Sequence, residues 1–172
     1  LTALGIDAFL DLTSEGERRP YDSLLPAGIE YLRHGMRDHG LPESPAQMQQ
    51  ILADLHRWLA RGRRVYVHCR AGIGRTGMVV GCHLVQRGHL GESALRELNR
   101  LWLDSARSAS WPSVPETAEQ ADFVATWNAV DLGIATVPEA AGDPRTLELA
   151  RRLRERFHGA LLGLAVGDAV AA

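Results

Sequence analysis

The segment VYVHCRAGIGRTG, residues 65–77, combines a β-branched and aromatic run, a glycine-containing turn and the start of a helix. Five residues separate Cys69 from Arg75, enough for the backbone to curl so that successive N–H groups point inward. Such a concavity binds anions, and the N-terminus of the helix behind it adds positive potential at the same place. That field also favours the thiolate form of Cys69, which is the nucleophilic form of cysteine. We therefore expect this segment to hold a phosphate group against a reactive sulfur.

The other residues of the segment fit the same task. Two glycines permit the turn and keep side chains away from the anion. The planar guanidinium of Arg75 can bind two phosphate oxygens at once. The predicted phosphate-binding residues are Arg70, Ala71, Gly72, Ile73, Gly74 and Arg75.

The pattern formed by His68-Cys69 and Arg75-Thr76-Gly77 resembles the signature loop of the cysteine-dependent protein tyrosine and dual-specificity phosphatases. The resemblance implies that Cys69 is the nucleophile and takes the phosphoryl group as a thiophosphate. It implies that Arg75 binds the substrate phosphate and the transition state, and that the Thr76 hydroxyl steadies the departing thiolate. His68 would orient the loop through hydrogen bonds. The alternative is a buried structural cysteine beside a helix cap.

A candidate proton donor lies in HGMRDHGLP, residues 34–42. Cleavage of a phosphate ester needs an acid for the leaving oxygen, and a carboxylic acid on a mobile loop can supply it. In dual-specificity phosphatases this acid lies in a loop of the type P-I-x-D-x-x-x-P, and Asp38, with a proline four residues later, matches it. Gly35 and Met36 replace the usual Pro-Ile pair, which departs from the family pattern. An aspartate in a solvated turn and a competing acid at His39 are the alternatives.

The apolar pattern along the chain predicts an α/β domain. Strands are expected at 6–13, at 29–32 and before Cys69, and helices are expected over 44–62, 75–86, 91–103 and from about residue 117. The resemblance implies a three-layer phosphatase fold, with a mostly parallel central sheet of four or five strands and helices on both faces. The reactive loop should lie at the carboxyl end of a central strand, where ligands bind in such sheets. Similar phosphatases have further strands before residue 6, so we expect an abbreviated domain or a fragment.

Four later residues each have two interpretations. Gln120 resembles the glutamine that positions the hydrolytic water in related phosphatases, but Thr117-x-x-Gln120 is also a capping box. Cys82 is expected to be an inert thiol in the core, with a redox partnership with the catalytic cysteine as the alternative. Arg100 and Arg107 are surface arginines by default, although both could reach a substrate.

Composition excludes several other classes of protein. The chain has 172 residues, a formal net charge of −2 and two cysteines. Near-neutral charge gives no reason to expect binding to nucleic acid or a membrane, and no segment approaches the ~18 apolar residues that cross a bilayer. A catalytic cysteine without a disulfide framework indicates a reducing compartment, so we expect a cytoplasmic protein. The start at Leu1–Gly5 reads as the last turn of a helix, so a leader could precede it. No metal or other cofactor is expected, because the loop supplies the positive field.

The chain is expected to contain a phosphatase-like domain at 1–130, a linker at 131–142 rich in Ala, Gly and Pro, and a helical tail at 143–172. The stretch RFHGALLGLAVGDAV, residues 156–170, resembles the opening helix of ADP-ribosylglycohydrolases. The acidic motifs that bind that family's metal ions are missing, so the resemblance implies only the start of such a domain. The alternative is an amphipathic helix specific to the phosphatase. Its apolar face would pack on its own domain or mediate self-association.

The predicted function is hydrolysis of a phosphorylated protein or another phosphomonoester through a cysteinyl-phosphate intermediate. Asp38 would act as the general acid, and Asp38 and Gln120 would align the water of the second step. One alternative is a phosphate-binding module with little or no turnover, because the acid loop departs from the family pattern. Another is a sulfur-transferring rhodanese-like domain, against which Asp38 and the Arg75-Thr76-Gly77 sequence argue.

Overall fold

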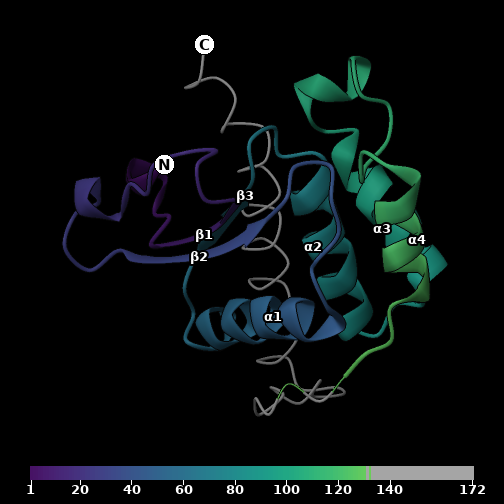
Figure 1. Cartoon of the computed structure of the whole chain (residues 1–172), viewed down its shortest axis with the longest axis horizontal. Helices are drawn as coiled ribbons and strands as arrows, with labels where there is room; N and C mark the ends of the chain where they lie inside the picture. The colour runs from purple at the N-terminus through teal and green to yellow at the C-terminus, as the bar shows by residue number, and fades with distance from the viewer. Residues whose placement is uncertain (131, 133–172) are drawn as a thin grey trace, which may run out of the picture.

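The computed structural model describes residues 1–130 and 132, which form one small parallel sheet and a group of helices (Figure 1). In this part of the chain the strands are β1 (Ala8–Thr13), β2 (Glu30–Met36) and β3 (Val65–His68). The α-helices are α1 (Pro45–Ala60), α2 (Gly74–Gln86), α3 (Gly91–Trp102) and α4 (Ala118–Thr126). Short 3-10 helices are η1 (Thr2–Leu4), η2 (Asp22–Leu24) and η3 (Ala106–Ala109). The predicted linker, the tail and its glycohydrolase-like stretch lie outside the described residues.

The sheet has the order β2-β1-β3, and both pairs of strands are parallel. Toward the carboxyl ends of the strands, Asp11 of β1 lies opposite Arg33 of β2 on one side and opposite His68, the last residue of β3, on the other. The parallel α/β fold that we expected is therefore confirmed. The described residues contribute three strands where four or five were expected, and the strand predicted at 29–32 extends to Met36. The reactive loop was expected after a central strand, but β3 is an outer strand of the described sheet, because it pairs only with β1.

Alternate side chains of β1 enter two different apolar clusters, as the two faces of a pleated strand require. Ala8, Leu10 and Leu12 lie in the main core with side chains of α1 and α2. Phe9 points to the other face and packs in a smaller cluster that η1 and the segment around η2 cover. In the described part of the chain, α-helices therefore cover one face of the sheet, while 3-10 helices and loop residues cover the other.

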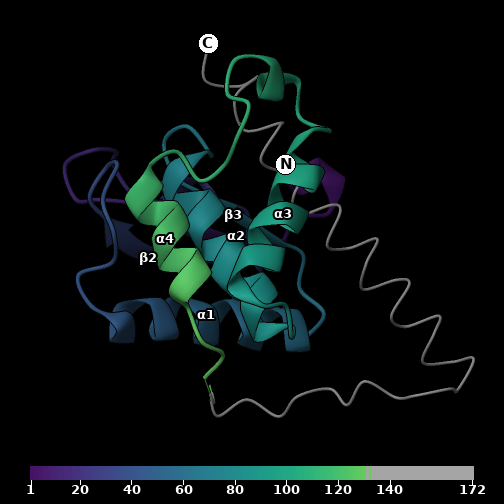
Figure 2. The ribbon, with the colours of Figure 1, turned by 90° about the vertical axis from the view of Figure 1, so that its right-hand side faces the viewer.

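Helix α2 is the central helix, and twelve of its thirteen residues are buried. It contacts α1, α3 and α4, and α3 and α4 lie on the side of α2 remote from the sheet (Figures 1 and 2). Helix α1, within the range expected over 44–62, has a side-chain cap, since the Ser44 hydroxyl accepts the N–H of Gln47. Among residues 1–130 and 132, none of the helices has the length and apolar character that crossing a bilayer requires.

The carboxyl ends of the three strands meet at one edge of the sheet, because all three run in the same direction. The loops that follow β1, β2 and β3 therefore gather at this edge. Direct contacts show this convergence: the Arg75 side chain, which follows β3, reaches the carbonyl of Leu12 at the end of β1 and that of Met36 at the end of β2. The edge contains the candidate site.

Candidate active site

The predicted phosphate loop connects β3 to α2 and has the expected concave form. Gly72 has φ 73°, a left-handed conformation that glycine adopts without strain. Its N–H donates to Cys69 Sγ at 3.3 Å, which is the interaction that stabilises a thiolate. In the described part of the chain, the N–H groups of Arg70, Ala71, Ile73 and Gly74 donate no hydrogen bond. These donors lie between the nucleophile and the first turn of α2, where an anion needs them.

Arg75 lies in the first turn of α2 and is 1% exposed. Its Nη1 donates to Glu17 Oε2 at 2.7 Å and to the carbonyl of Met36 at 2.9 Å. Its Nη2 donates to Glu17 Oε1 at 2.8 Å and to Asp38 Oδ1 at 2.7 Å. Burial by itself would lower the pKa of Arg75, but the hydrogen bonds to Glu17 and the charges of Cys69 and the two carboxylates raise it. The guanidinium is thus a permanent cation, and its side chain is held in one orientation.

Glu17 is the residue of this site that the sequence analysis missed. It lies in the segment after β1 that reads as an ordinary polar surface loop, yet its side chain is only 11% exposed. Both of its oxygens bind Arg75, and Oε2 also accepts the N–H of Ser14. These hydrogen bonds with Arg75 lower the pKa of Glu17 from 4.5 to about 2. No local pattern marks this glutamate, since its partner lies 58 residues further along the chain.

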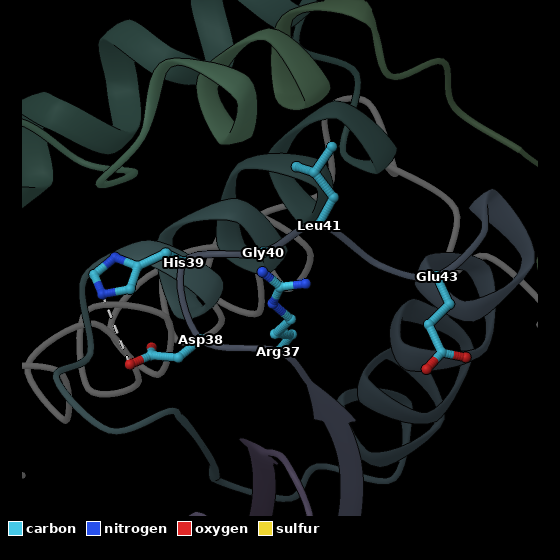
Figure 3. A pocket seen from close by; sticks show the side chains of 6 residues that line it. All are labelled: Arg37, Asp38, His39, Gly40, Leu41 and Glu43. Atoms are coloured by element: carbon cyan, nitrogen blue, oxygen red, sulfur yellow. Dashed lines mark ion pairs between the residues drawn. The ribbon is translucent and has the colours of Figure 1, made fainter.

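Asp38 lies in the loop after β2, as predicted, and its carboxylate meets Arg75. The side chain is 43% exposed, so solvent or a substrate can also reach it. The loop surrounds a pocket of about 360 Å³ lined by Arg37, Asp38, His39, Gly40, Leu41 and Glu43. Figure 3 shows the side chains of Asp38 and His39 turned toward one another, while that of Arg37 points away from Asp38. The candidate acid thus lies at the boundary between the buried arginine and an open cavity.

Gln120 is fully buried beside the phosphate loop. A Cβ atom on Gly74 would lie 2.8 Å from Gln120 Oε1, so the glutamine packs against a backbone that only glycine can provide. Its Nε2 donates to the carbonyl of Gly40 at 3.0 Å in the acid loop. The capping box with Thr117 is also formed. Both interpretations of Gln120 are therefore compatible with its position, because one side chain caps α4 and faces the phosphate loop.

His68 lies directly before Cys69 and is held at both ring nitrogens. Nδ1–H donates to the carbonyl of Cys69 at 3.2 Å, so in a neutral ring Nε2 accepts from the hydroxyl of Tyr21, 2.5 Å away. Burial lowers the pKa of His68, which keeps the ring neutral. The carboxylate of Asp11 beneath it binds Tyr31 and Arg33. This network supports the end of β3, from which the phosphate loop begins.

The remaining candidates differ in their relation to the site. Thr76 is fully buried, and its Oγ1 has no hydrogen-bond partner among the described residues. Arg107 Nη1 donates to the carbonyl of Ala71 at 2.6 Å, so this arginine contacts the phosphate loop. Arg100 instead pairs with a glutamate on the exposed face of α3. Cys82 is buried in the main core, as expected for a packed thiol, and burial raises its pKa.

Curated relatives are similar to part of this chain. A putative tyrosine phosphatase, 067L, of Invertebrate iridescent virus 3 is 36% identical over 92 residues, which are 49% of this chain and 36% of the viral protein. The phosphatidylglycerophosphate phosphatase PTPMT1 of Arabidopsis thaliana is 34% identical over 77 residues, 41% of this chain and 23% of that protein. The chain thus spans about a third or less of the length of these two relatives.

A solved structure and a family model also match this chain. The crystal structure of Tk-PTP in the active form has a TM-score of 0.60 and 28% identity, and the match covers 72% of this chain and 79% of that one. The family model Tc-R-P, described as a polymorphic toxin system, DSP-PTPase phosphatase, matches residues 1–89. This match takes in just over half of the 172 residues, including Asp38, Cys69 and Arg75. The chain therefore belongs to the DSP-PTPase phosphatase family of polymorphic toxin systems.

Proposed function

We propose that this chain hydrolyses phosphomonoesters in two steps through a cysteinyl-phosphate intermediate. One observation carries the proposal: two sequence segments, residues 34–42 and 65–77, bring a cysteine, a buried arginine and a carboxylate to the same edge of the sheet. Gly72 N–H contacts Cys69 Sγ, and Asp38 contacts Arg75. Each group supplies a different requirement of phosphoryl transfer, namely the nucleophile, the positive charge and the proton.

In the first step the Cys69 thiolate attacks phosphorus, and the bond between phosphorus and the ester oxygen breaks. Arg75 and the N–H groups of residues 70–75 bind the three non-bridging oxygens and stabilise the charge that spreads over them. Asp38, in its protonated form, donates its proton to the leaving oxygen and becomes a carboxylate. The product alcohol or phenol leaves, and the phosphoryl group stays on sulfur.

In the second step water attacks the phosphorus of the thiophosphate. The Asp38 carboxylate takes a proton from this water, and the Gln120 side chain helps to align it. The bond between phosphorus and sulfur breaks, and the electron pair returns to Cys69 as a thiolate. The Thr76 hydroxyl, buried and without a hydrogen-bond partner among the described residues, can donate to this thiolate. Phosphate leaves, and Asp38 is again protonated.

One observation favours the alternative of a phosphate-binding module with little turnover. Glu17 and Asp38 together occupy both terminal nitrogens of Arg75, so a substrate phosphate has to displace Asp38 to reach Nη2. A protein in which Asp38 stayed bound to Arg75 would bind phosphate poorly and would lack its proton donor. Turnover therefore requires that Asp38 move from the arginine toward the leaving group.

The test measures turnover and binding in parallel. Wild-type protein and Cys69→Ser are assayed with p-nitrophenyl phosphate, and orthovanadate affinity is measured for both. We expect turnover by the wild type and none detectable for Cys69→Ser, because a serine hydroxyl is not ionised at neutral pH. Vanadate binding without turnover by the wild type would instead support the binding module. Turnover by Cys69→Ser at the wild-type rate would refute the mechanism.

The substrate and the setting are also proposals. We propose a phosphorylated protein or another phosphomonoester as substrate; the curated relatives are named a tyrosine phosphatase and a phosphatidylglycerophosphate phosphatase, so both substrate classes belong in the assay. Two free cysteines support a reducing setting such as the cytoplasm. The division at residues 130 and 142, the glycohydrolase-like tail and its self-association remain predictions.

A further inference from the structure

His39 follows the candidate acid directly, and its backbone has a left-handed conformation with φ 56°. This conformation is uncommon for residues other than glycine, although histidine, asparagine and aspartate adopt it more often than the rest, and it concentrates at functional sites. The imidazole lies between two carboxylates: Nε2 is 3.8 Å from Asp38 Oδ2 (Figure 3), and Nδ1 is 3.4 Å from Glu116 Oε2. The side chain of His39 is 62% exposed, so core packing does not explain its position.

Glu116 belongs to the segment that forms the opposite wall of the site. Its Oε2 would lie 3.0 Å from a Cβ on Gly74, so this carboxylate is next to the phosphate loop. The same segment leads into α4, where Gln120 donates to the carbonyl of Gly40. The acid loop therefore meets this wall at two successive residues: the backbone of Gly40 is held by Gln120, and the imidazole of His39 lies beside Glu116.

The contacts of Asp38 show why the imidazole matters for the reaction. One oxygen, Oδ1, is bound to Arg75 Nη2, and the other, Oδ2, faces His39. A substrate phosphate that takes Nη2 removes the first contact and leaves the second. Among the described residues, His39 is then the side chain that remains within ion-pair distance of the Asp38 carboxylate. Glu116 Oε2 lies 3.4 Å from Nδ1, where it favours the ring orientation that places Nε2 toward Asp38.

We propose that His39 is a positioning residue which, oriented by Glu116, holds the Asp38 carboxyl toward the leaving oxygen once phosphate has displaced it from Arg75. This inference rests on the proposed function. It predicts an effect that depends on the leaving group, because a misplaced acid matters only when the leaving oxygen needs a proton. A purely structural role for His39 would affect all substrates alike.

The test compares p-nitrophenyl phosphate, which has a good leaving group, with phenyl phosphate, which has a poor one. His39→Asn removes the imidazole but retains a residue that tolerates the left-handed backbone. We expect the ratio of kcat/KM for p-nitrophenyl phosphate to that for phenyl phosphate to rise about tenfold, part of the 10²–10⁴-fold that a general acid supplies. Glu116→Gln should raise the ratio about threefold. His89→Asn, the same substitution after the far end of α2, should leave the ratio unchanged.

A second measurement uses Asp38→Ala as the background. If His39 acts through Asp38, adding His39→Asn to Asp38→Ala causes no further loss with phenyl phosphate, because coupled residues are not additive. Multiplicative losses, or an unchanged ratio in both His39→Asn and Glu116→Gln, would overturn the inference. A wild-type protein that hydrolyses neither ester would overturn the proposed function instead, so the two failures can be distinguished.

Discussion

Helix α2 carries a buried ionisable side chain near each end. The surroundings favour the charged form at one end and the neutral form at the other. Arg75 in the first turn is 1% exposed and His83 in the last turn is 4% exposed. Arg75 is surrounded by Glu17, Asp38 and carbonyl oxygens, and its pKa is raised. His83 Nδ1 lies 2.7 Å from His56 Nε2 on α1, and burial lowers the pKa of His83 well below its ordinary value.

The difference shows what a buried charge needs. Burial alone disfavours the charged form, so His83 is neutral and the histidine pair acts as an internal hydrogen bond. Burial with two carboxylates preserves the charge of Arg75, and the proposed mechanism requires Asp38 to move before a phosphate can reach Nη2. The two cysteines also differ in their surroundings. Cys69 Sγ accepts a hydrogen bond from the N–H of Gly72, whereas Cys82 lies in the core, where burial raises its pKa. One end of α2 is therefore adapted to chemistry and the other to packing.

The largest expected effect comes from Arg75→Lys. Lysine retains the positive charge beside Glu17, so the fold should persist, but an ammonium cannot present a planar pair of donors to phosphate. We expect kcat/KM for p-nitrophenyl phosphate to fall by about 10³-fold or more, the range for an arginine that stabilises phosphoryl transfer. His83→Gln, at the packing end of the same helix, is the control and should change kcat/KM by less than about threefold. Equal losses at both ends would contradict the contrast.

Asp38→Ala tests the carboxylate that binds Arg75 at the position where the substrate phosphate is proposed to bind. Loss of the general acid should lower kcat for phenyl phosphate by about 10²–10⁴-fold. Vanadate should bind at least as tightly as in the wild type, because Arg75 Nη2 is no longer occupied by a carboxylate. Steady-state kinetics and competitive inhibition by vanadate measure the two effects. Weaker vanadate binding would show that Asp38 assists the anion rather than competing with it.

Much of the fold was predictable, because its signals are local. The helices expected over 44–62 and 75–86 correspond to α1 and α2, because a capping serine with apolar spacing and a continuous apolar run are features of neighbouring residues. The predictions of the strands before Asp38 were less accurate in length. A partly buried strand such as β2, with polar residues Arg33 and His34, has no continuous apolar run to mark its end.

The candidate site was predictable only where a local motif marks its residues. Cys69 and Arg75 share one motif and Asp38 lies in another, so the sequence marked all three as candidates, and the structure brings them to one edge of the sheet. Glu17 was missed because its meaning depends on a contact across the fold, and a glutamate in a polar loop has no distinguishing local feature. The same holds for Glu116, which faces the acid loop only because α4 packs beside α2.

Glu17→Ala measures what the missed carboxylate contributes to stability. Removing one partner of a buried ion pair should lower the free energy of unfolding by about 3 kcal/mol at pH 7, near the lower end of such losses since Asp38 remains. The folded pKa of Glu17 is about 2 against an ordinary 4.5, so the folded state binds fewer protons than the unfolded state between these values. The contribution is present above about pH 4.5 and is lost as pH falls toward 2. Urea unfolding should show the two proteins converging over that interval.

The pair formed by His56 and His83 affects the free energy of unfolding in a different pH range, and its expected effect is the smallest of those predicted. The pKa of His56 is lowered from 6.5 to about 4, mainly by burial and also by the charge of Arg87. The unfolded state therefore binds more protons between these values, and stability is lost as pH falls below about 6.5.

By pH 5 the loss in the wild type should reach about 2 kcal/mol from His56 alone. Replacing both rings, in His56→Leu/His83→Leu, removes both members of the hydrogen-bonded pair together and should remove this loss. Urea unfolding at pH 6.5 and pH 5 measures it, above the window in which Glu17 titrates. If the double variant loses as much free energy of unfolding over this interval as the wild type, other groups cause the acid sensitivity. The neutral histidine pair near this end of α2 would then not contribute to the pH dependence of stability.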